Sequence, residues 1–198
     1  MIGAVVLAAG ASRRMGGEKV LLPFGRSTML ETILETLAAA NVHEIVVVTR
    51  PDLPAAIEKA RGLGARVVEN PHPQDEMLVS VRLGVAKVSA GAAAVFVWPA
   101  DHPAVRPETI ERLARSVDPA AALVPRYRGR RGHPALIGRG LLPAIAAIPA
   151  GAGLRHLWRS RPELLREIEV EDPGVILNLD TPEAYRAALA EQALDPEF

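Results

Sequence analysis

The apolar and polar positions of the 198-residue chain fall into two alternating patterns. Short unbroken apolar runs are typical of strands buried on both faces of a parallel sheet, whereas apolar residues spaced three and four apart indicate helices with one buried face. Because strand patterns alternate with helix patterns, the sequence predicts an α/β protein with a mostly parallel sheet between helix layers. The apolar runs cover residues 2–7, 45–48, 65–68, 93–98, 121–124 and 175–179.

Helical spacing occurs between these runs and is supported by capping residues. Thr28 and Glu31 have the spacing of a capping box, and the apolar residues after them predict a helix that faces the core. Pro107 suits the first turn of another helix, and Thr181 with Pro182 suits the start of the last one. The expected helices cover residues 30–37, 55–61, 78–88, 107–117 and 182–189.

Length and composition narrow the class of protein. A chain of 198 residues fits one domain, so we expect residues 1–198 to form a single domain. Lys plus Arg balance Asp plus Glu at 23 each, so no overall field attracts nucleic acid or an anionic membrane. The absence of cysteine excludes disulfides and thiol chemistry. With no leader pattern and no apolar run of about 18 residues, the expected location is the cytoplasm, without a membrane partner.

The segment after the first apolar run has the composition of a phosphate-binding loop. Residues 7–19 read LAAGASRRMGGEK, in which small residues around Gly10 let a ligand approach the backbone N–H groups. Arg13, Arg14 and Lys19 add positive charge within the same stretch, and this number of donors suits a polyphosphate better than a carboxylate. The plain alternative is a basic solvated loop that follows a strand.

Better-known catalytic motifs are absent from the sequence. Lys19 stands between Glu18 and Val20, so the Gly-Lys-Ser/Thr end of a Walker A loop is missing. Gly10 is followed two residues later by Ser12, which breaks a G-x-G-x-x-G dinucleotide fingerprint. There is no G-x-S-x-G or H-E-x-x-H, and the five histidines are scattered. The sequence therefore favours neither an ATPase, a dehydrogenase, a hydrolase nor a zinc enzyme.

Residues 7–19 fill every fixed position of the pattern L-A-A-G-x-S-x-R-M-G-x-x-K. This closely resembles the signature of nucleotidyltransferases of the molybdenum cofactor cytidylyltransferase type and their guanylyltransferase relatives. The resemblance implies one nucleotidyltransferase domain with a Rossmann-like sheet sandwiched by helices, the GT-A-like architecture of nucleotide-diphospho-sugar transferases. It also implies that Arg14 and Lys19 are catalytic, and that the nucleotide is bound at Leu7, Ala8, Ala9 and Gly10.

An aspartate that follows a predicted strand is the first expected metal ligand. Asp101 lies in the turn Pro-Ala-Asp-His-Pro at residues 99–103, and ligands of open parallel sheets bind at the carboxyl ends of strands. Taken alone, such an aspartate is usually a turn former. The turn resembles the family's P-x-D-x-P, which carries a magnesium-binding aspartate, so the resemblance gives Asp101 a catalytic and a Mg²⁺-binding role. His102 is interpreted as structural or supporting.

The second expected metal ligand lies near the end of the chain. Residues 177–182, LNLDTP, resemble the family's D-I-D-T-P segment, which approaches the metal from the other side. Asn178 replaces the first carboxylate and offers only a neutral oxygen, so the metal role is assigned to Asp180, with Asn178 left as an alternative. Asp180 could instead only stabilise the N-terminus of the following helix, by ~0.3–1 kcal/mol.

A third segment resembles the part of the family that runs beside the nucleotide base. Residues 70–82, NPHPQDEMLVSVR, are similar to N-P-x-x-x-x-G-M-x-x-S-L-R. Asn70 and Ser80 are expected to hydrogen-bond the base edge; alone they would be a turn former and a helix-surface hydroxyl. Glu76 replaces the family glycine and Val81 replaces leucine, which leaves the nucleotide preference open.

The densest basic segment, RYRGRRGHP at residues 126–134, is expected on the acceptor side. Its second half resembles the family's G-x-R-G-H-P, so Arg131, Gly132 and His133 are assigned to a phosphorylated acceptor. A nucleic-acid site is the alternative, which the zero net charge disfavours. Residues 151–155 keep the glycines and arginine of the family's G-D-x-G-A-R but lack its aspartate.

Together these segments imply a magnesium-dependent transfer of NMP from an NTP to a phosphorylated small-molecule acceptor, with release of pyrophosphate. The LAAG opening favours CTP and a molybdopterin-type acceptor, because the guanylyl branch usually reads LAGG. A guanylyl- or sugar-phosphate nucleotidyltransferase is the alternative enzyme, and a nucleotide-binding regulatory module without turnover is the alternative of another class. The acceptor phosphate has a second pKa of about 6, so it is already largely nucleophilic at neutral pH and needs no protein base.

Overall fold

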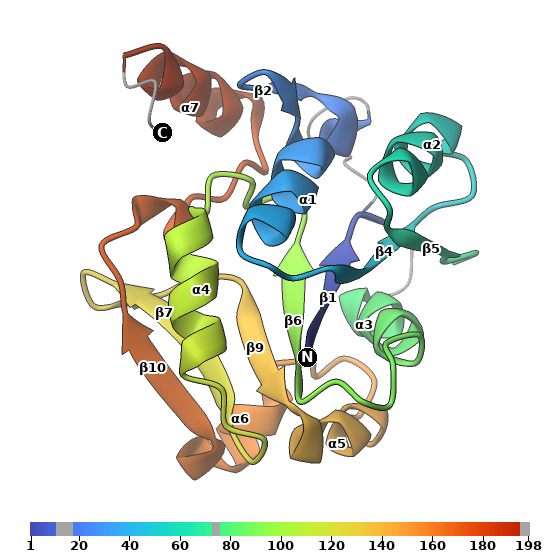
Figure 1. The fold of residues 1–198 in the computed structure, drawn as a ribbon, viewed down its shortest axis with the longest axis vertical. Coiled ribbons are helices and arrows are strands. Elements are labelled where there is room, and N and C mark those ends of the chain that lie inside the picture. Colours follow the sequence, from blue (N-terminus) through green and yellow to red (C-terminus); the bar gives the residue numbers. More distant parts are fainter. Residues whose placement is uncertain (11–17, 73–75, 195–198) are drawn as a thin grey trace.

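The structure, a computed structural model, describes residues 1–10, 18–72 and 76–194 (Figure 1). Its main sheet has the strand order β10-β7-β9-β6-β1-β4-β5, and β8 pairs with β7 beside this path. The strands are β1 (Ile2–Leu7), β4 (Glu44–Thr49), β5 (Arg66–Glu69), β6 (Ala94–Pro99), β7 (Ala122–Tyr127), β8 (Arg130–Arg131), β9 (Ala135–Gly138) and β10 (Leu165–Glu169). A separate hairpin joins β2 (Pro23–Phe24) to β3 (Ser27–Thr28).

The helices lie between the strands along the chain. The α-helices are α1 (Met29–Ala39), α2 (Pro54–Gly62), α3 (Met77–Val85), α4 (Pro107–Arg115), α5 (Leu142–Ala146), α6 (His156–Ser160) and α7 (Pro182–Leu194). The 3-10 turns are η1 (Lys19–Leu21), η2 (Arg139–Leu141), η3 (Pro162–Leu164) and η4 (Pro173–Ile176). Among the described residues, no helix combines the length and the apolar character needed to cross a bilayer.

The central part of the sheet is parallel, as the sequence predicted. β1 pairs in parallel with β4 and β6, and β4 pairs in parallel with β5. β9 is antiparallel to both β6 and β7, while β10 is parallel to β7. The α/β fold class and the mostly parallel, Rossmann-like sheet are therefore confirmed, with an antiparallel insertion between β6 and β7.

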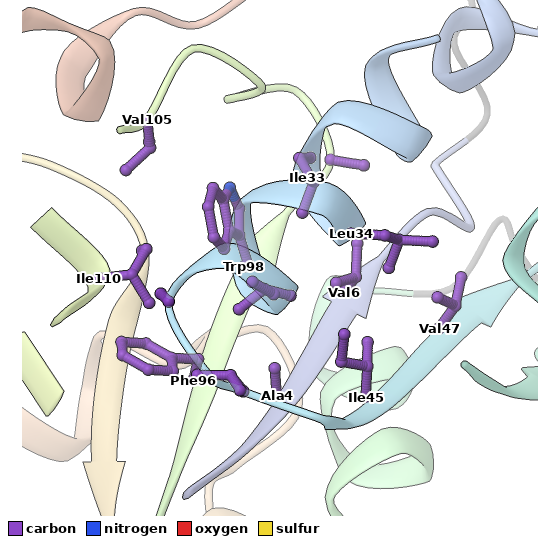
Figure 2. Close-up of a cluster of buried hydrophobic side chains, with 14 of the residues drawn as sticks. Ala4, Val6, Ile33, Leu34, Ile45, Val47, Phe96, Trp98, Val105 and Ile110 are labelled. Atoms are coloured by element: carbon purple, nitrogen blue, oxygen red, sulfur yellow. The ribbon is translucent and has the colours of Figure 1, made fainter. Parts of the chain in front are cut away.

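One face of the sheet is covered by α1, α2 and α4. Figure 2 shows this apolar layer, in which Val6, Phe96 and Trp98 of the sheet lie near Ile33 of α1 and Ile110 of α4. All five side chains are fully buried. Phe96 and Trp98 lie two residues apart on β6, so both side chains face this layer.

The other face is covered by α3, α5 and α6. Val5 and Val48 of the sheet pack there with Leu78 of α3 and Ile145 of α5. Helix α3 lies very close to the sheet, since a Cβ added at Gly84 would be 2.3 Å from a methyl carbon of Val5. With both faces covered, consecutive strand residues are buried, which explains the unbroken apolar runs of the sequence.

The predicted helix caps are confirmed. Thr28 accepts from the N–H of Glu31 at 3.4 Å, and the Glu31 carboxylate accepts from the N–H of Thr28 at 2.9 Å, which forms the capping box of α1. Thr181 accepts from the N–H of Ala184 at 3.2 Å at the start of α7. Helices α3 and α4 end at Val85 and Arg115, two or three residues earlier than the apolar spacing predicted.

The predicted strand at residues 175–179 is wrong. Pro173–Ile176 form the 3-10 turn η4, and residues 177–180 belong to no helix or strand. The backbone is used for loop contacts instead, because the carbonyl of Val175 accepts from the N–H of His133 and Leu179 N–H donates to the carbonyl of Asp101. Strands β9 and β10 were not predicted.

Candidate active site

The carboxyl ends of β1, β4 and β6 lie side by side because these strands are parallel. The chain leaves β1 at Ala8, whose N–H donates to the carbonyl of Val48 at 2.8 Å. It leaves β6 at Ala100, whose N–H donates to the carbonyl of Leu7 at 3.1 Å. Asp101 follows at once, so it lies at the edge of the sheet where the loop after β1 begins.

Lys19 lies between two carboxylates at this edge. Its Nζ is 3.8 Å from Oδ2 of Asp101 and 2.5 Å from Oδ1 of Asp180. The Lys19 side chain is only 8% exposed, whereas that of Asp180 is 47% exposed. A buried ammonium is stabilised only when it is paired, and here two carboxylates neutralise it. Three residues that are far apart in the sequence thus form one charged cluster, Lys19–Asp101–Asp180.

Asp180 reaches this cluster through backbone hydrogen bonds rather than through the sheet. The N–H of Leu179 donates to the carbonyl of Asp101 at 2.9 Å, which fixes the two segments side by side. Earlier in the same segment, the carbonyl of Val175 accepts from the N–H of His133 at 2.8 Å. The segment 173–180 is therefore held between the turn after β6 and the loop before β9.

Asp172 anchors the start of that segment. Its carboxylate is 3% exposed and accepts from the N–H of Arg106 at 2.9 Å, the hydroxyl of Thr109 at 2.7 Å and the N–H of Gly174 at 2.9 Å. No side chain fits at Gly174, because a Cβ there would lie 2.0 Å from the carbonyl oxygen of Ala104. The position of Asp180 therefore depends on a buried network at the N-terminus of α4.

The Asp101 carboxylate is strongly biased toward the ionised form. Burial raises its pKa, but the hydrogen bond and charge of His102 and the charge of Lys19 lower it by more, so the pKa lies at about 2. His102 Nδ1 is 2.7 Å from Asp101 Oδ1. At neutral pH the cluster therefore presents a carboxylate that is ready to bind a cation.

The donor set of the cluster fits a hard divalent cation that also binds a triphosphate. Asp101 and Asp180 offer carboxylate oxygens within reach of one point, the Nζ of Lys19. Mg²⁺ is usually held by one or two carboxylates together with substrate phosphates and water, not by a full protein cage. Asn178 is exposed, so the contact with Lys19 belongs to Asp180.

Asn70 and Ser80, the predicted base-binding residues, bond to each other. Asn70 Nδ2 donates to Ser80 Oγ at 3.0 Å, and Asn70 Oδ1 accepts from the N–H of His72 at 2.9 Å. Both residues are buried, and the N–H of Asn70 donates to the carbonyl of Thr49. Their polar groups thus shape the turn after β5 in the first instance, and a contact with a nucleotide base stays a prediction.

Glu76, which replaces the family glycine, links two loops. Its Oε2 accepts from the N–H of Gly151 at 2.6 Å, and Gly151 has a positive φ of 82°. Six residues further along α3, Arg82 donates to the carbonyls of Ile145 and Ile148 around the end of α5. Glu76 before α3 and Arg82 in its last turn therefore hold α5 and the loop around Gly151, where the family's G-D-x-G-A-R motif has lost its aspartate.

Arg131, predicted to bind the acceptor, takes part in a surface ion-pair network. Its guanidinium pairs with Glu167 of β10 at 2.6 Å and 2.7 Å, and Arg126 pairs with the same Glu167 and with Glu169. The Arg131 side chain is 57% exposed. Gly132 is buried, and a Cβ there would lie 2.4 Å from the carbonyl oxygen of Val175. The glycine therefore allows the close approach of η4.

His133 contacts His102, which in turn contacts Asp101 of the cluster. The two rings are 4.6 Å apart between centroids and tilted by 59°. Burial lowers the pKa of His133 to about 4, with further lowering by His102 and Arg155 and an opposing effect of Asp101. His133 is therefore neutral at pH 7, and its buried Nδ1 has no hydrogen-bond partner among the described residues. Of the three predicted acceptor residues, His133 contacts His102, the hydrogen-bond partner of Asp101.

The nucleotide loop is described only at its two ends. Leu7, Ala8 and Ala9 are buried and Gly10 is exposed, so the loop leaves the sheet surface at Gly10. Lys19 then begins η1. The predicted catalytic residue Arg14 lies outside the described residues, together with Arg13.

Comparisons with known proteins agree with this arrangement of segments. The family model described as "MobA-like NTP transferase domain" matches residues 4–168, which include the loop after β1 and the turn that carries Asp101. The chain belongs to this family of nucleotidyltransferases. Membership confirms the resemblance that the sequence motifs indicated, and it makes the protein a nucleotidyltransferase that acts on nucleoside triphosphates.

Two curated relatives match almost end to end. The chain is 33% identical to nicotine blue oxidoreductase of Paenarthrobacter nicotinovorans, over 90% of this chain and 92% of that protein. It is 26% identical to the molybdenum cofactor cytidylyltransferase of Escherichia coli strain K12, over 94% and 95% of the two chains. The two names belong to different reaction classes.

Solved structures share the whole architecture. A nucleotidyl transferase from Methanothermobacter (Mth528) superposes with a TM-score of 0.84 at 27% identity, over 98% of this chain and 99% of that one. Rv0371c from Mycobacterium tuberculosis in complex with manganese superposes with a TM-score of 0.77 at 28% identity, over 96% and 97%. One structural relative was therefore obtained with a divalent metal.

Asp172 escaped the sequence interpretation, and the contact of His102 with Asp101 was not predicted. Asp172 stands before Pro173 and Gly174, and Asp before Pro is a recognisable start of a helical turn. This signal was available, but the partners of Asp172 on α4 lie more than 60 residues away and no local pattern indicates them. The contact between His102 and Asp101 carries no sequence signal beyond their adjacency.

Proposed function

We propose that this protein transfers NMP from an NTP, with CTP preferred, to a phosphorylated small-molecule acceptor of the molybdopterin type and releases pyrophosphate. The observation that carries the proposal is the Lys19–Asp101–Asp180 cluster at the carboxyl ends of the parallel strands. A cation-binding pair of carboxylates beside a buried lysine is what a triphosphate needs for charge neutralisation.

Each residue of the cluster has a distinct role in this proposal. Asp101 and Asp180 hold Mg²⁺, which when bound neutralises the triphosphate oxygens. Lys19 stabilises the negative charge that gathers on the α-phosphoryl group and on the departing pyrophosphate. Arg14 is proposed to share that task. Since the acceptor phosphate is already nucleophilic at neutral pH, no side chain has to remove a proton from it.

The acceptor side of the site rests on fewer contacts. His133 is neutral and lies against His102, so it is available to hydrogen-bond an acceptor group. Arg131 is exposed and pairs with Glu167, which also pairs with Arg126. An acceptor phosphate would thus have to compete with one carboxylate for Arg131. A guanylyl- or sugar-phosphate nucleotidyltransferase uses the same cluster and differs only in the base and the acceptor.

The 33% identity to an oxidoreductase requires a test that separates reaction classes. Thermal unfolding is measured with CTP, GTP, ATP and UTP, each with and without Mg²⁺. The proposal predicts stabilisation by at least one NTP that depends on the metal and is greatest for CTP, because a ligand that binds only the native state raises the melting temperature. Equal melting temperatures under all conditions would overturn the nucleotide site, whereas a preference for GTP would overturn only the choice of base.

A further inference from the structure

The His102 side chain makes a hydrogen bond with one oxygen of Asp101. Its Nδ1 lies 2.7 Å from Oδ1 of the neighbouring carboxylate, and its side chain is 7% exposed. A carboxylate can only accept, so Nδ1 carries the hydrogen and the imidazole donates. The other oxygen of Asp101, Oδ2, is the one that faces Lys19 at 3.8 Å. The two oxygens of one carboxylate thus have different partners on different sides.

Both the backbone and the ring of His102 are held by neighbouring residues. The carbonyl oxygen of His102 accepts from Trp98 Nε1 at 3.0 Å, and its N–H donates to the carbonyl of Pro99 at 3.2 Å. Trp98 is completely buried in the core of β6. The His102 ring also packs against the ring of His133, with 4.6 Å between the ring centroids. The backbone of the turn is therefore tied to the core, and the ring has little freedom to leave Asp101.

A fixed donor on Oδ1 determines the orientation of the Asp101 carboxylate. Without it, the carboxylate plane could rotate about its terminal torsion, which is broad and nearly two-fold for aspartate. When a residue that hydrogen-bonds a metal-binding carboxylate is replaced, the metal affinity typically falls about 10–100-fold. Lys19 cannot fix the plane equally well, because it is 3.8 Å from Oδ2 and lies nearer to Asp180.

We propose that His102 is a positioning residue that holds Asp101 Oδ1 and thereby presents Oδ2 to the metal and triphosphate. This inference rests on the proposed function, since it concerns the same cluster. It predicts that the side chain at position 102 controls the affinity for the metal–nucleotide complex, and that only a donor placed as Nδ1 is placed preserves that affinity.

Three substitutions separate this role from simple packing. In His102→Asn, the amide nitrogen can take the place of Nδ1, because both atoms are bonded to Cγ. His102→Gln carries its amide one bond further out, where it cannot reach Oδ1 in the same way. His102→Phe keeps a ring of similar size but has no donor. His43→Phe is the matched control, because His43 is an exposed histidine whose side chain makes no hydrogen bond or ion pair with the described residues.

The probe is Mn²⁺–CTP, with Mn²⁺–GTP in a parallel series. Enhancement of water-proton relaxation reports the fraction of the manganese–nucleotide complex held by the protein, and calorimetry without metal reports binding of the nucleotide alone. His102→Phe and His102→Gln are expected to raise the Kd of Mn²⁺–nucleotide about 10–100-fold. The Kd of metal-free nucleotide should stay unchanged, and His102→Asn should remain within about threefold of the parent.

The outcomes distinguish this inference from the proposed function. If the parent protein binds neither Mn²⁺–CTP nor Mn²⁺–GTP, the proposed function fails and the role of His102 fails with it. If the parent binds and His102→Phe binds equally well, only the positioning role is overturned. Equal weakening in the Asn, Gln and Phe variants, or loss of metal-free nucleotide binding, would show a packing role instead. Should the Phe variant not fold, the Asn–Gln pair gives the same decision.

Discussion

The two halves of the sheet reach the active site in different ways. Around β1, β4 and β6, the strands are parallel and buried, and their ends deliver the loop after β1 and the Asp101 turn to one edge. Around β7, β9 and β10, the strands are mixed in direction, and the contribution to the site comes from η4 and the irregular residues 177–180 after it. The first half positions its residues through sheet register, the second through hydrogen bonds between loops.

This difference predicts unequal sensitivity to substitution. A residue at the end of a buried parallel strand is held by many contacts, so changing its functional group alters chemistry more than structure. A residue on an irregular segment depends on a few specific bonds, so a distant change in those bonds displaces it. Asp101, just after β6, is an example of the first kind, and Asp180 with its support at Asp172 is an example of the second.

The largest effect is expected for the lysine of the first half. Lys19→Ala should lower kcat, measured as pyrophosphate release, by about 10²–10³-fold, the scale of losing one preorganised charge-stabilising donor. It should not weaken Mn²⁺ binding, because Lys19 Nζ contacts the same Asp180 oxygen that a metal would use. Lys59→Ala, which removes an ion-paired lysine outside the cluster, is the control. A Lys19→Ala enzyme with the parent rate would contradict the mechanism.

In the second half of the sheet, the expected effect is a loss of folding stability. Asp172→Ala leaves two backbone N–H groups and the Thr109 hydroxyl without their acceptor, and unsatisfied buried donors cost about 1–3 kcal/mol each in general. With partial relaxation, urea unfolding should show a loss of about 2–4 kcal/mol. Asp52→Ala is the matched control, since the Asp52 side chain is 70% exposed. Equal stabilities of the two variants would refute the anchoring role of Asp172.

A pH-dependent effect is expected at the capping box of α1. Hydrogen bonds from Lys59 and Thr28 lower the pKa of Glu31 to about 2, from an ordinary value near 4.5. Its folded-state pKa is depressed, so the stabilisation is present above about pH 4.5 and is lost as the pH falls through 2. Because the pair is partly solvated, Glu31→Gln should lower the free energy of unfolding by about 1 kcal/mol at pH 7.

The check on Glu31 is urea unfolding at several pH values. The difference between the parent and Glu31→Gln should shrink below pH 4.5 and vanish near pH 2. A difference that stayed constant across this range would show that the Glu31 charge contributes nothing. The capping hydrogen bond to the N–H of Thr28 can persist in the Gln variant, so the comparison isolates the charge.

The smallest structural effect is expected at Arg131. Its ion pair with Glu167 is exposed, so Arg131→Ala should change stability by under about 1 kcal/mol. If the segment faces the acceptor, this variant should raise the KM of the acceptor and leave NTP affinity unchanged. Arg128→Ala, which removes an exposed arginine that lies over Tyr127, is the control. A salt-sensitive, Arg131-dependent gel shift with nucleic acid, together with unaltered acceptor kinetics, would overturn the assignment.

The same contrast explains what the sequence could predict. The runs that became β1, β4, β6 and β7 were identifiable because most residues on both faces of these strands are buried. The edge strand β5 was identifiable from its half-buried Val67 and Val68. β10 carries Arg166, Glu167 and Glu169 on an outer strand, so it shows no apolar run. Residues 175–179 do show one, but they form no strand: Val175 packs into the core on one face of the sheet, and Leu179 packs with Met29 of α1 and Ala188 of α7. Apolarity indicates burial, and it does not identify the element.

The arrangement of the candidate site was also predictable only in part. The motif resemblance selected Lys19, Asp101 and Asp180, and the structure brings these three together. Asn70 and Ser80 were selected as base contacts, but their mutual hydrogen bond depends on how the turn after β5 meets α3. The pairing of Arg131 with Glu167 depends on the register of β7 with β8 and β10, which no local pattern encodes.

The central claim is that the two halves supply one carboxylate each to the same cation. The direct test is a double-substitution cycle on Mn²⁺–CTP affinity with Asp101→Asn, Asp180→Asn and the combined variant. If both carboxylates hold one ion, each single change weakens binding and the combined effect falls short of the sum of the two. Effects that add independently, or an Asp180→Asn variant that binds as the parent does, would contradict a shared metal site.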